Sequence, residues 1–395
     1  MDLKKNNSIE KYIINPSSEY LRNFSIPLMT AGILIALIAI ITLLWQGPWG
    51  ISAGYRNWGD WILFLTGISE TKPTAPWLNG ISLSNIGILT GASASALLSG
   101  KFALQRAPAG EYFKAAIGGI LMGAGAVLAG GCNVGGFFSA IGLFSLGGYA
   151  MMAGLGAGAY IGLKILIWEI NRKENRPSET IKTFPQIKAP EKLQQPVGII
   201  IIGSLILIFY YYSGQNKTIE GGLLFFGMMT GIIMHRSRFC FARAFRCPFM
   251  TGDSEMVKVV ALSLAVYGTG AAVIKWAYIQ PPLTGTHHPF WLGSLTGGIL
   301  FGTGMVIAGG CASSTLWRIG EGNIRLILTL ISFALTNALL YPVIKQPAIS
   351  SLLGKGVCLP ELVSWNATIP VFVIILTLWV AITAWNEKTD KFVIF

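Results

Sequence analysis

Three cysteines occupy positions where an apolar stretch ends and a short polar or glycine-rich stretch begins. Cys132 and Cys311 each follow the tripeptide Ala-Gly-Gly, whereas Cys240 lies in an arginine-rich stretch. A thiol is a soft, polarizable group and a weak hydrogen-bond donor. In apolar surroundings we expect these thiols to stay protonated, so that they can donate to an anion without repelling it. Free cysteines are often simply small buried side chains, but the matching position of two of them favours a functional role.

Four arginines surround Cys240 in the sequence. Arg236 and Arg238 precede it and can anchor a helix end at a membrane surface. Arg243 and Arg246 follow it on a short segment, where an unpaired cation inside a membrane is costly. We therefore expect these two arginines to attract or hold an anion.

Neutral donors follow the other two cysteines. Asn133 follows Cys132, and Ser313, Ser314 and Thr315 follow Cys311. At the start of a short helix, such residues and the free backbone N–H groups present partial positive charge to an anion. Helix capping alone explains them equally well. The aromatic residues that could narrow a path between these groups are Tyr55, Trp58, Phe137, Phe138 and Trp317.

Several other kinds of chemistry are excluded by the sequence. Five widely spaced cysteines without a Cys-x-x-Cys pair, and three histidines, give no zinc-site spacing. The Gly-x-Gly patterns at 123–125 and 302–304 lie inside long apolar stretches without a preceding strand, which rules out a dinucleotide site. Carboxylates are nearly absent from the apolar stretches. The chain therefore has few residues that could form a cation-selective ring of carboxylates or a carboxylate proton relay. We expect no metal and no cofactor.

The composition is typical of a chain whose solvent is lipid. Hydrophobic residues make up 53% of the 395 positions and charged residues 12%. The apolar runs, each of about twenty residues, have the length that spans a bilayer as a helix. The net charge of +12 is spread over short loops between these runs, which indicates membrane topology and not nucleic-acid binding.

The runs predict an all-α polytopic membrane protein of about ten transmembrane helices. They lie near residues 26–45, 82–100, 115–131, 148–169, 197–213, 221–238, 257–279, 291–310, 324–344 and 367–385. The loops predicted on one side are rich in Lys and Arg, whereas the opposite loops hold mainly Arg56, Lys72, Lys217, Lys345 and Lys355. Because Lys and Arg in short loops resist translocation, we expect both termini to be cytoplasmic.

An internal repeat relates the two halves of the chain. The stretch from Gly118 to Cys132 and the stretch from Gly297 to Cys311 share eleven of fifteen positions, at an offset of 179. Convergent packing of small residues could produce a few such matches, but an ordered run that ends in the same cysteine favours duplication.

Four intervals are too short and too polar or glycine-rich to span, and we expect them to be re-entrant helical segments. They cover residues 47–67, 133–148, 239–253 and 312–323, two in each half. An extra span separates the halves, so the first pair enters from outside and the second from inside. This topology predicts an inverted repeat whose four breaks meet at the membrane centre.

The same reading divides the chain into five parts. We expect a cytoplasmic tail at 1–25, the first membrane repeat at 26–170, a cytoplasmic linker at 171–196, the second repeat at 197–387 and a short tail at 388–395. The linker is rich in Lys, Arg and Pro and reads as a connection with no domain of its own.

Three motifs together resemble the YeeE/YedE family of bacterial inner-membrane proteins. They are the two Ala-Gly-Gly-Cys elements, the Arg-Phe-Cys-Phe-x-x-Ala-Phe-Arg stretch at 238–246 and the stretch at 308–318. The stretches at 55–59 and 131–138 look more like the YedE branch, which has been linked to selenium metabolism, than the YeeE branch of thiosulfate uptake proteins.

The resemblance implies an hourglass-shaped inner-membrane protein in which a sulfur-containing anion passes between thiols through S–H hydrogen bonds. Cys132 and Cys311 match the two relay cysteines that end the repeated helices. The thiosulfate branch has its third cysteine in the first half, where this chain has Tyr55-Arg-Asn-Trp58 and no thiol. Here the third thiol is Cys240, in the second half, and this departure leaves the substrate open.

We therefore predict a transporter or channel for a small soft anion, thiosulfate or a related sulfur or selenium species, that passes the three thiols. One alternative is a membrane thiol enzyme that passes sulfur or selenium to a cytoplasmic acceptor, but no adjacent general base or Cys-x-x-Cys pair supports it. A pure scaffold would not need cysteines at symmetric breaks. The transport hypothesis leaves room for a cytoplasmic sulfur- or selenium-carrier protein as partner.

Overall fold

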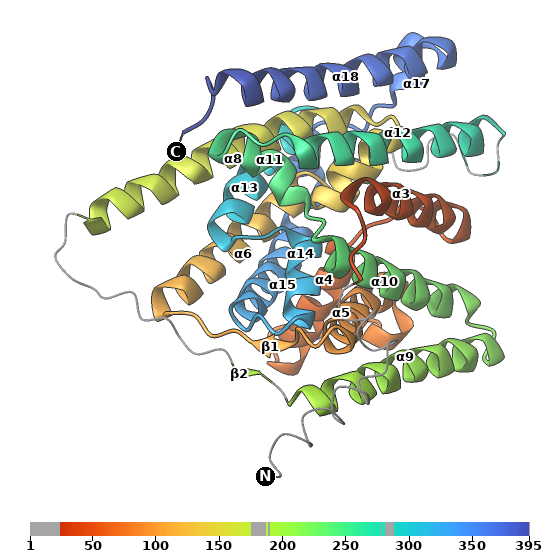
Figure 1. Ribbon diagram of the computed structural model, residues 1–395. Coiled ribbons are helices and arrows are strands. Elements are labelled where there is room, and N and C mark those ends of the chain that lie inside the picture. Colours follow the sequence, from red (N-terminus) through yellow and green to blue (C-terminus); the bar gives the residue numbers. More distant parts are fainter. Residues whose placement is uncertain are drawn as a thin grey trace, which may run out of the picture.

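The fold is described from a computed structural model (Figure 1). It describes residues 24–174, 187–188, 190–277, 279, 281 and 288–394. Nearly all of the predicted tail at 1–25, much of the predicted linker at 171–196 and His287 lie outside the described residues.

In the described part of the chain, ten segments are long and apolar enough to cross a membrane, and the prediction of an all-α polytopic membrane protein is confirmed. Each predicted span overlaps one of them. Their helices are α3 (Leu28–Trp45), α5 (Gly80–Leu98), α6 (Ala109–Leu128), α8 (Leu146–Glu174), α9 (Glu191–Gly214), α10 (Thr218–Ser237), α12 (Glu255–Trp276), α13 (Leu292–Ala308), α15 (Arg325–Ile344) and α18 (Trp365–Thr389).

Short helices lie in all four intervals that were too short to span. They are α4 (Ser52–Leu65), the π-helical turn η2 (Asn133–Ser139) with α7 (Ala140–Gly142), α11 (Phe241–Met250) and α14 (Ala312–Gly320). The remaining elements are η1 (Pro76–Leu78), α16 (Pro347–Leu353), α17 (Leu359–Val363) and an antiparallel pair of two-residue strands, β1 (Ala103–Leu104) and β2 (Ile187–Lys188).

The two repeated helices, α6 and α13, cross at their glycines. A Cβ atom on Gly118 would lie 2.7 Å from the carbonyl oxygen of Gly304, and one on Gly125 would lie 2.5 Å from that of Gly297. Gly118 comes before Gly125 along α6, but its partner Gly304 comes after Gly297 along α13. The two helices therefore run antiparallel. An antiparallel crossing of repeated helices is what the predicted inverted repeat requires.

Each repeated helix also packs against an outer helix of the opposite half. On α6, a Cβ atom on Gly119 would lie 2.5 Å from the carbonyl oxygen of Thr329 in α15. On α13, one on Gly298 would lie 2.7 Å from that of Met151 in α8. Gly119 and Gly298 occupy equivalent positions in the repeat. Each glycine allows the backbone of the neighbouring outer helix to approach closely.

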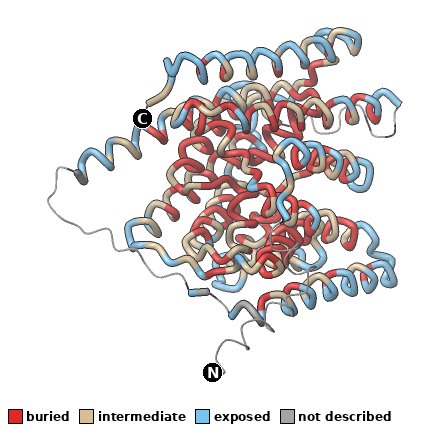
Figure 2. Tube along the Cα trace, in the orientation of Figure 1, coloured by how far each residue is buried: buried red, intermediate tan, exposed pale blue. Residues whose placement is uncertain are grey.

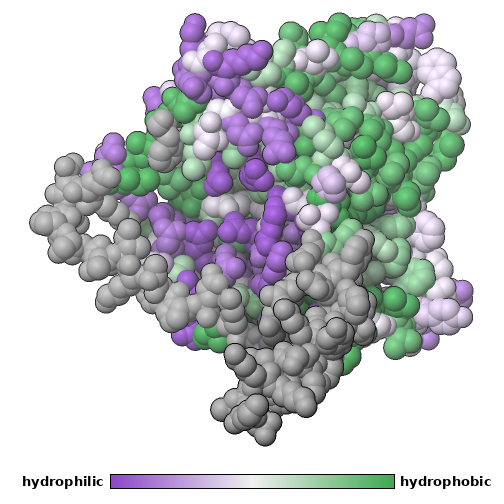
Figure 3. Space-filling model, in the orientation of Figure 1, coloured by the Kyte–Doolittle hydropathy of each residue, from purple (hydrophilic) through white to green (hydrophobic). Residues whose placement is uncertain are grey.

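Burial separates an inner group of helices from an outer one (Figure 2). In the most apolar 18-residue stretch of α5, 67% of the residues are buried, and the same share is buried in the segment that runs from α13 through α14. In the corresponding stretches of α9 and α18, only 11% and 22% of the residues are buried. Figure 1 shows α9 and α18 along opposite edges of the bundle. Hydrophobic side chains gather over the right-hand part of the face in Figure 3, and hydrophilic ones gather toward the segments drawn in grey.

Candidate functional site

Cys132 lies where α6 has ended and η2 begins. Its side chain is fully buried, and its backbone is extended, with φ −80° and ψ −174°. The sulfur accepts hydrogen bonds from the backbone N–H groups of Val134, Gly135 and Ser52. Since Ser52 is the first residue of α4, the thiol joins the starts of two short helices from the first half.

Cys311 occupies the equivalent position at the start of α14, also fully buried, with φ −89° and ψ 179°. Its sulfur lies 3.4 Å from the hydroxyl oxygen of Ser313 and hydrogen-bonds to the thiol of Cys240. Cys240 precedes the first residue of α11, so a thiol pair joins the starts of two short helices from the second half. The structure therefore brings Cys240 and Cys311 together.

Tyr55 connects the two halves. Its hydroxyl donates a 3.0 Å hydrogen bond to the carbonyl oxygen of Ala312, the first residue of α14. The Tyr55 side chain is 1% exposed and interacts electrostatically with both Cys132 and Cys311. Cys132 and Cys311 also interact electrostatically with each other. The short helices of both halves thus begin in one common region, as predicted for their breaks.

Several buried polar side-chain atoms near the thiols have no hydrogen-bond partner among the described residues, and those of Asn133 and Thr315 lie closest to Cys132 and Cys311 in the chain. Both amide atoms of Asn133 are unpaired, and so is the hydroxyl of Thr315. Asn133 is 0% exposed and Thr315 is 1% exposed. A buried amide without partners is costly, so Asn133 is not a helix cap but a group available to a ligand.

The two predicted serines have different roles. The Ser314 hydroxyl accepts a 2.7 Å hydrogen bond from the backbone N–H of Cys311 and donates to its carbonyl oxygen at 3.2 Å. Ser314 therefore caps α14, and its side chain also hydrogen-bonds with the thiols of Cys240 and Cys311. Ser313 contacts the Cys311 sulfur alone, where it can orient the thiol.

The predicted arginines lie at different places around α11. Arg243 forms a loose ion pair with Asp253, at 3.8 Å, and is one third exposed. The Nε atom of Arg246 is buried and has no partner among the described residues. Arg318, on α14, donates a 2.7 Å hydrogen bond to the carbonyl oxygen of Gly309 and interacts electrostatically with Cys240 and Arg246.

An ion pair links Arg238, two residues before Cys240, to Glu321, which directly follows α14. The guanidinium of Arg238 donates two hydrogen bonds, of 2.6 and 2.7 Å, to the carboxylate of Glu321 and lies 5.5 Å from the centre of the Trp317 ring. Burial would raise the pKa of Glu321, but the hydrogen bonds and charge of Arg238 outweigh burial and hold this pKa below its ordinary value. The pair is therefore ionised at neutral pH.

Aromatic side chains fill the space around the thiols. Phe138 stacks on Tyr267, with ring centres 5.3 Å apart, and contacts Phe241 at 5.4 Å. Phe137 meets Phe245 at 5.1 Å. All five rings are buried, so this part of the described structure is closely packed.

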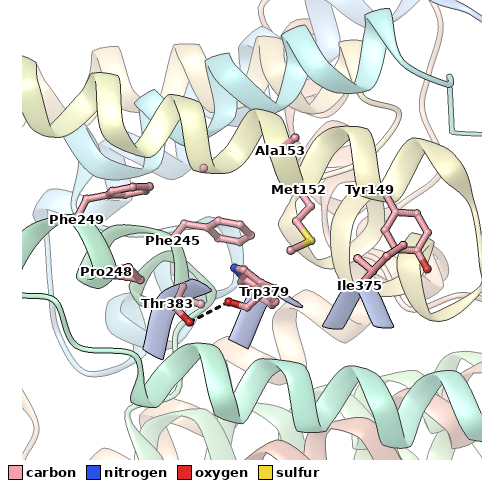
Figure 4. Close-up of a pocket in the computed structure, with 11 residues that line it drawn as sticks. Tyr149, Met152, Ala153, Phe245, Pro248, Phe249, Ile375, Trp379 and Thr383 are labelled. Carbon is pink, nitrogen blue, oxygen red and sulfur yellow. Dashed lines mark hydrogen bonds between the residues drawn. The ribbon is translucent and has the colours of Figure 1, made fainter. Parts of the chain in front are cut away.

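A cavity of about 390 Å³ adjoins α11 on its other side, between α8 and α18 (Figure 4). Phe245, Phe249, Met152 and Trp379 dominate its lining in the close-up, and the hydroxyl of Thr383 bonds to the backbone of its own helix. No charged residue lines this cavity. It offers an anion no binding partner.

The arrangement at the thiols suits a soft anion. Three thiols, an unpaired amide and an unpaired hydroxyl can each donate a hydrogen bond, and the starts of α4, α11 and α14 add partial positive charge. Among the described residues, no group of three or more His, Cys, Asp or Glu side chains is arranged to hold a metal ion.

Comparison with known proteins defines the family. The sequence profile described as sulphur transport matches residues 16–161 and 236–393, which is more than half of the chain. The chain belongs to the sulphur transport family. Both matched parts carry a cysteine that ends a repeated helix, and the second also carries Cys240.

Relatives within this family are named as transporters. The probable transporter YedE of Escherichia coli is 28% identical over 296 residues, covering 70% of this chain and 71% of its own length. The probable transporter YedE of Salmonella typhimurium is 27% identical with the same coverage. The thiosulfate transporter TsuA of Escherichia coli is 32% identical over 126 residues, 32% of this chain and 34% of its own length.

Sequence reasoning missed two members of the site. Tyr55 was named only as a ring that could narrow the path, and no pattern in the sequence indicates its hydrogen bond to α14. Arg318 was not singled out as a site residue, although its place in the expected re-entrant segment at 312–323, three residues after Thr315, was a usable signal.

Proposed function

We propose that this chain transports a small sulfur-containing anion, thiosulfate being the leading candidate, along a path through Cys132 and the Cys240–Cys311 pair. Membership of the sulphur transport family and relatives named as transporters support transport and weigh against a thiol enzyme. The observation that carries the path is the meeting of the short helices of both halves around buried thiols and the unpaired Asn133.

In this mechanism the anion exchanges water for S–H, O–H and amide N–H donors, and no covalent bond forms. The thiols stay neutral, so that they donate without repelling the anion. Tyr55 holds the starts of α4 and α14 together, while Arg246 and Arg318 favour negative charge near Cys240. The inverted repeat supplies an equivalent thiol for each side of the membrane, which makes stepwise transfer from Cys132 to Cys311 the simplest route.

Uptake of labelled thiosulfate into vesicles that contain the purified protein tests the proposal. We expect Cys311→Ala to abolish uptake while the amount of protein in the membrane is unchanged, because the variant removes the donor at the second break. Cys247→Ala is the matched control: Cys247 lies on α11, is buried and has no contact with the other thiols that the structure shows. Normal uptake by Cys311→Ala would refute the thiol path.

The same vesicles test the substrate. Selenite and sulfite are the other oxyanions to compare, because the resemblance to the YedE branch connects the chain with selenium. Mass analysis of the three cysteines after transport should show unmodified thiols, whereas a stable persulfide would favour covalent transfer.

A further inference from the structure

A second cavity, of about 410 Å³, has Ser52 and Gly130, both close to Cys132 in the fold or in the chain, among its lining residues. We name it the Arg56 vestibule. Parts of α4, α6, α15 and α16 form its walls, together with the segment around Pro289. Its lining residues that carry polar side chains are Ser52, Arg56, Asn337, Tyr341, Lys345 and Ser350.

The vestibule holds two cations and no carboxylate. The guanidinium carbon of Arg56 lies 3.6 Å from the centre of the Tyr341 ring, and the ammonium of Lys345 lies 5.3 Å from it. Neither cation has an ion-pair partner among the described residues; Asp60, one turn along α4, interacts with Arg56 only at longer range. Two like charges held against one ring repel each other, and a bound anion would relieve that repulsion.

A buried amide also lines this cavity without a partner. Asn337 is 3% exposed, yet its side chain makes no hydrogen bond within the described structure. Ser52 and Ala53, in the first turn of the fourteen-residue helix α4, line the same cavity. The start of α4 thus adds partial positive charge to the cavity that the Asn337 side chain also lines.

The vestibule lies beside the backbone that surrounds Cys132. Ser52, in its wall, donates its backbone N–H to the sulfur of Cys132, and Gly130, also in its wall, lies two residues before that cysteine. At the opposite end, Lys345 and Ser350 are exposed. The vestibule therefore extends from exposed residues to the neighbours of Cys132.

The equivalent position beside the other half lacks these features. The cavity next to α11 is lined by Phe245 and Trp379, whose rings stack 5.6 Å apart, and contains no cation (Figure 4). The charged vestibule therefore belongs to one side of the molecule. The loop charges predict that this is the outer side.

We propose that the Arg56 vestibule is an anion-binding site that captures the oxyanion before it reaches Cys132, with Arg56, Lys345 and Asn337 as its ligands. The proposal rests on the proposed function for the identity of the anion. Arg56 supplies a planar pair of donors that suits an oxyanion, and Tyr341 holds it in place. Lys345 at the rim attracts the anion from solution.

Equilibrium binding of labelled thiosulfate to the purified, detergent-solubilised protein tests the site without transport. We expect Arg56→Gln to weaken binding about tenfold or more, since one charge-assisted contact is lost. Lys345→Gln should weaken it less, and its effect should shrink at high salt because Lys345 is exposed.

Lys72→Gln is the matched control, because Lys72 is an exposed cation predicted on the same side and lies outside the vestibule. Thermal unfolding shows whether Arg56→Gln remains folded, and Lys345→Gln tests the site at an exposed position. Equal binding by the wild type and both variants would overturn the site, and so would the absence of thiosulfate binding to the wild type. Binding that depends on Arg56 without any uptake would support the vestibule and refute the transport path.

Discussion

Asn133 shows most directly how one side chain can be placed for a ligand at the expense of stability. It follows Cys132, is completely buried and leaves both amide atoms without a partner in the described structure. Removal of an unsatisfied buried polar group usually stabilises a fold, whereas removal of a ligand contact impairs function. A single substitution separates these two effects.

We expect Asn133→Leu to abolish or strongly reduce thiosulfate uptake while it keeps or raises the unfolding temperature. Leucine has a similar size and carries no polar atoms, so the fold is relieved of a cost of about 1–3 kcal/mol. Uptake into vesicles and thermal unfolding in detergent are the two measurements. A less stable variant with normal uptake would show that Asn133 is a structural residue.

Residue types and spacing predicted part of this site. The repeated Ala-Gly-Gly-Cys elements were enough to identify Cys132 and Cys311, because both end a repeated helix. The pairing of Cys240 with Cys311 depends on how α11 and α14 meet, and spacing along the chain carries no information on that contact. The cap formed by Ser314 could not be distinguished from a ligand role, because the same hydroxyl serves either purpose.

At the scale of elements, glycines decide how closely the central helices approach. Gly125 and Gly297 face one another at the antiparallel crossing of α6 and α13, and a Cβ atom on either would lie within 2.6 Å of the carbonyl oxygen of the other. The thiols lie directly after the ends of these helices. A change in this crossing therefore changes the geometry of the path.

Gly125→Ala should destabilise the protein by about 1–3 kcal/mol, because the methyl group meets backbone atoms that cannot move aside independently. Gly203→Ala on the peripheral helix α9 is the control, since a Cβ atom there meets nothing within 4 Å. It should be neutral or slightly stabilising. Thermal unfolding of the two variants side by side measures the difference, and equal unfolding temperatures would contradict close packing at the crossing.

The sequence was most informative for these elements. A helix needs about twenty apolar residues to cross a bilayer, so all ten spans could be predicted from the lengths of the apolar runs. The four short helices were predicted from the polar or glycine-rich intervals between the spans. The Arg56 vestibule could not be predicted, because Arg56 and Tyr341 are far apart in the chain and meet only when α4 packs against α15. The order of α5, α10 and α9 in space likewise depends on contacts that the hydropathy pattern does not record.

For the whole molecule, the distribution of loop cations predicts which face meets the cytoplasm. The loop at 101–108 is on the predicted inner side, whereas α16 is on the predicted outer side next to the vestibule. This orientation gives the Arg56 vestibule access to the outside and the Arg238–Glu321 pair access to the inside.

Labelling with a membrane-impermeant maleimide tests the orientation. Ser351→Cys should react in intact spheroplasts and Arg106→Cys only after lysis, because both residues are exposed and lie on opposite predicted sides. The unsubstituted chain controls for its own cysteines, four of which are buried and one of which is partly buried. The reverse labelling pattern would invert the assignment of entry and exit.

The meeting of the starts of α4, α11 and α14 at one place has a consequence for bioenergetics. These helix starts raise the electrostatic potential around the thiols, so on the proposed path hydronium and sodium ions would meet a barrier that a negative ion does not. Carboxylates that could pass protons along are scarce among the residues that surround the thiols. A cell could therefore keep this protein in its membrane without dissipating the proton-motive force.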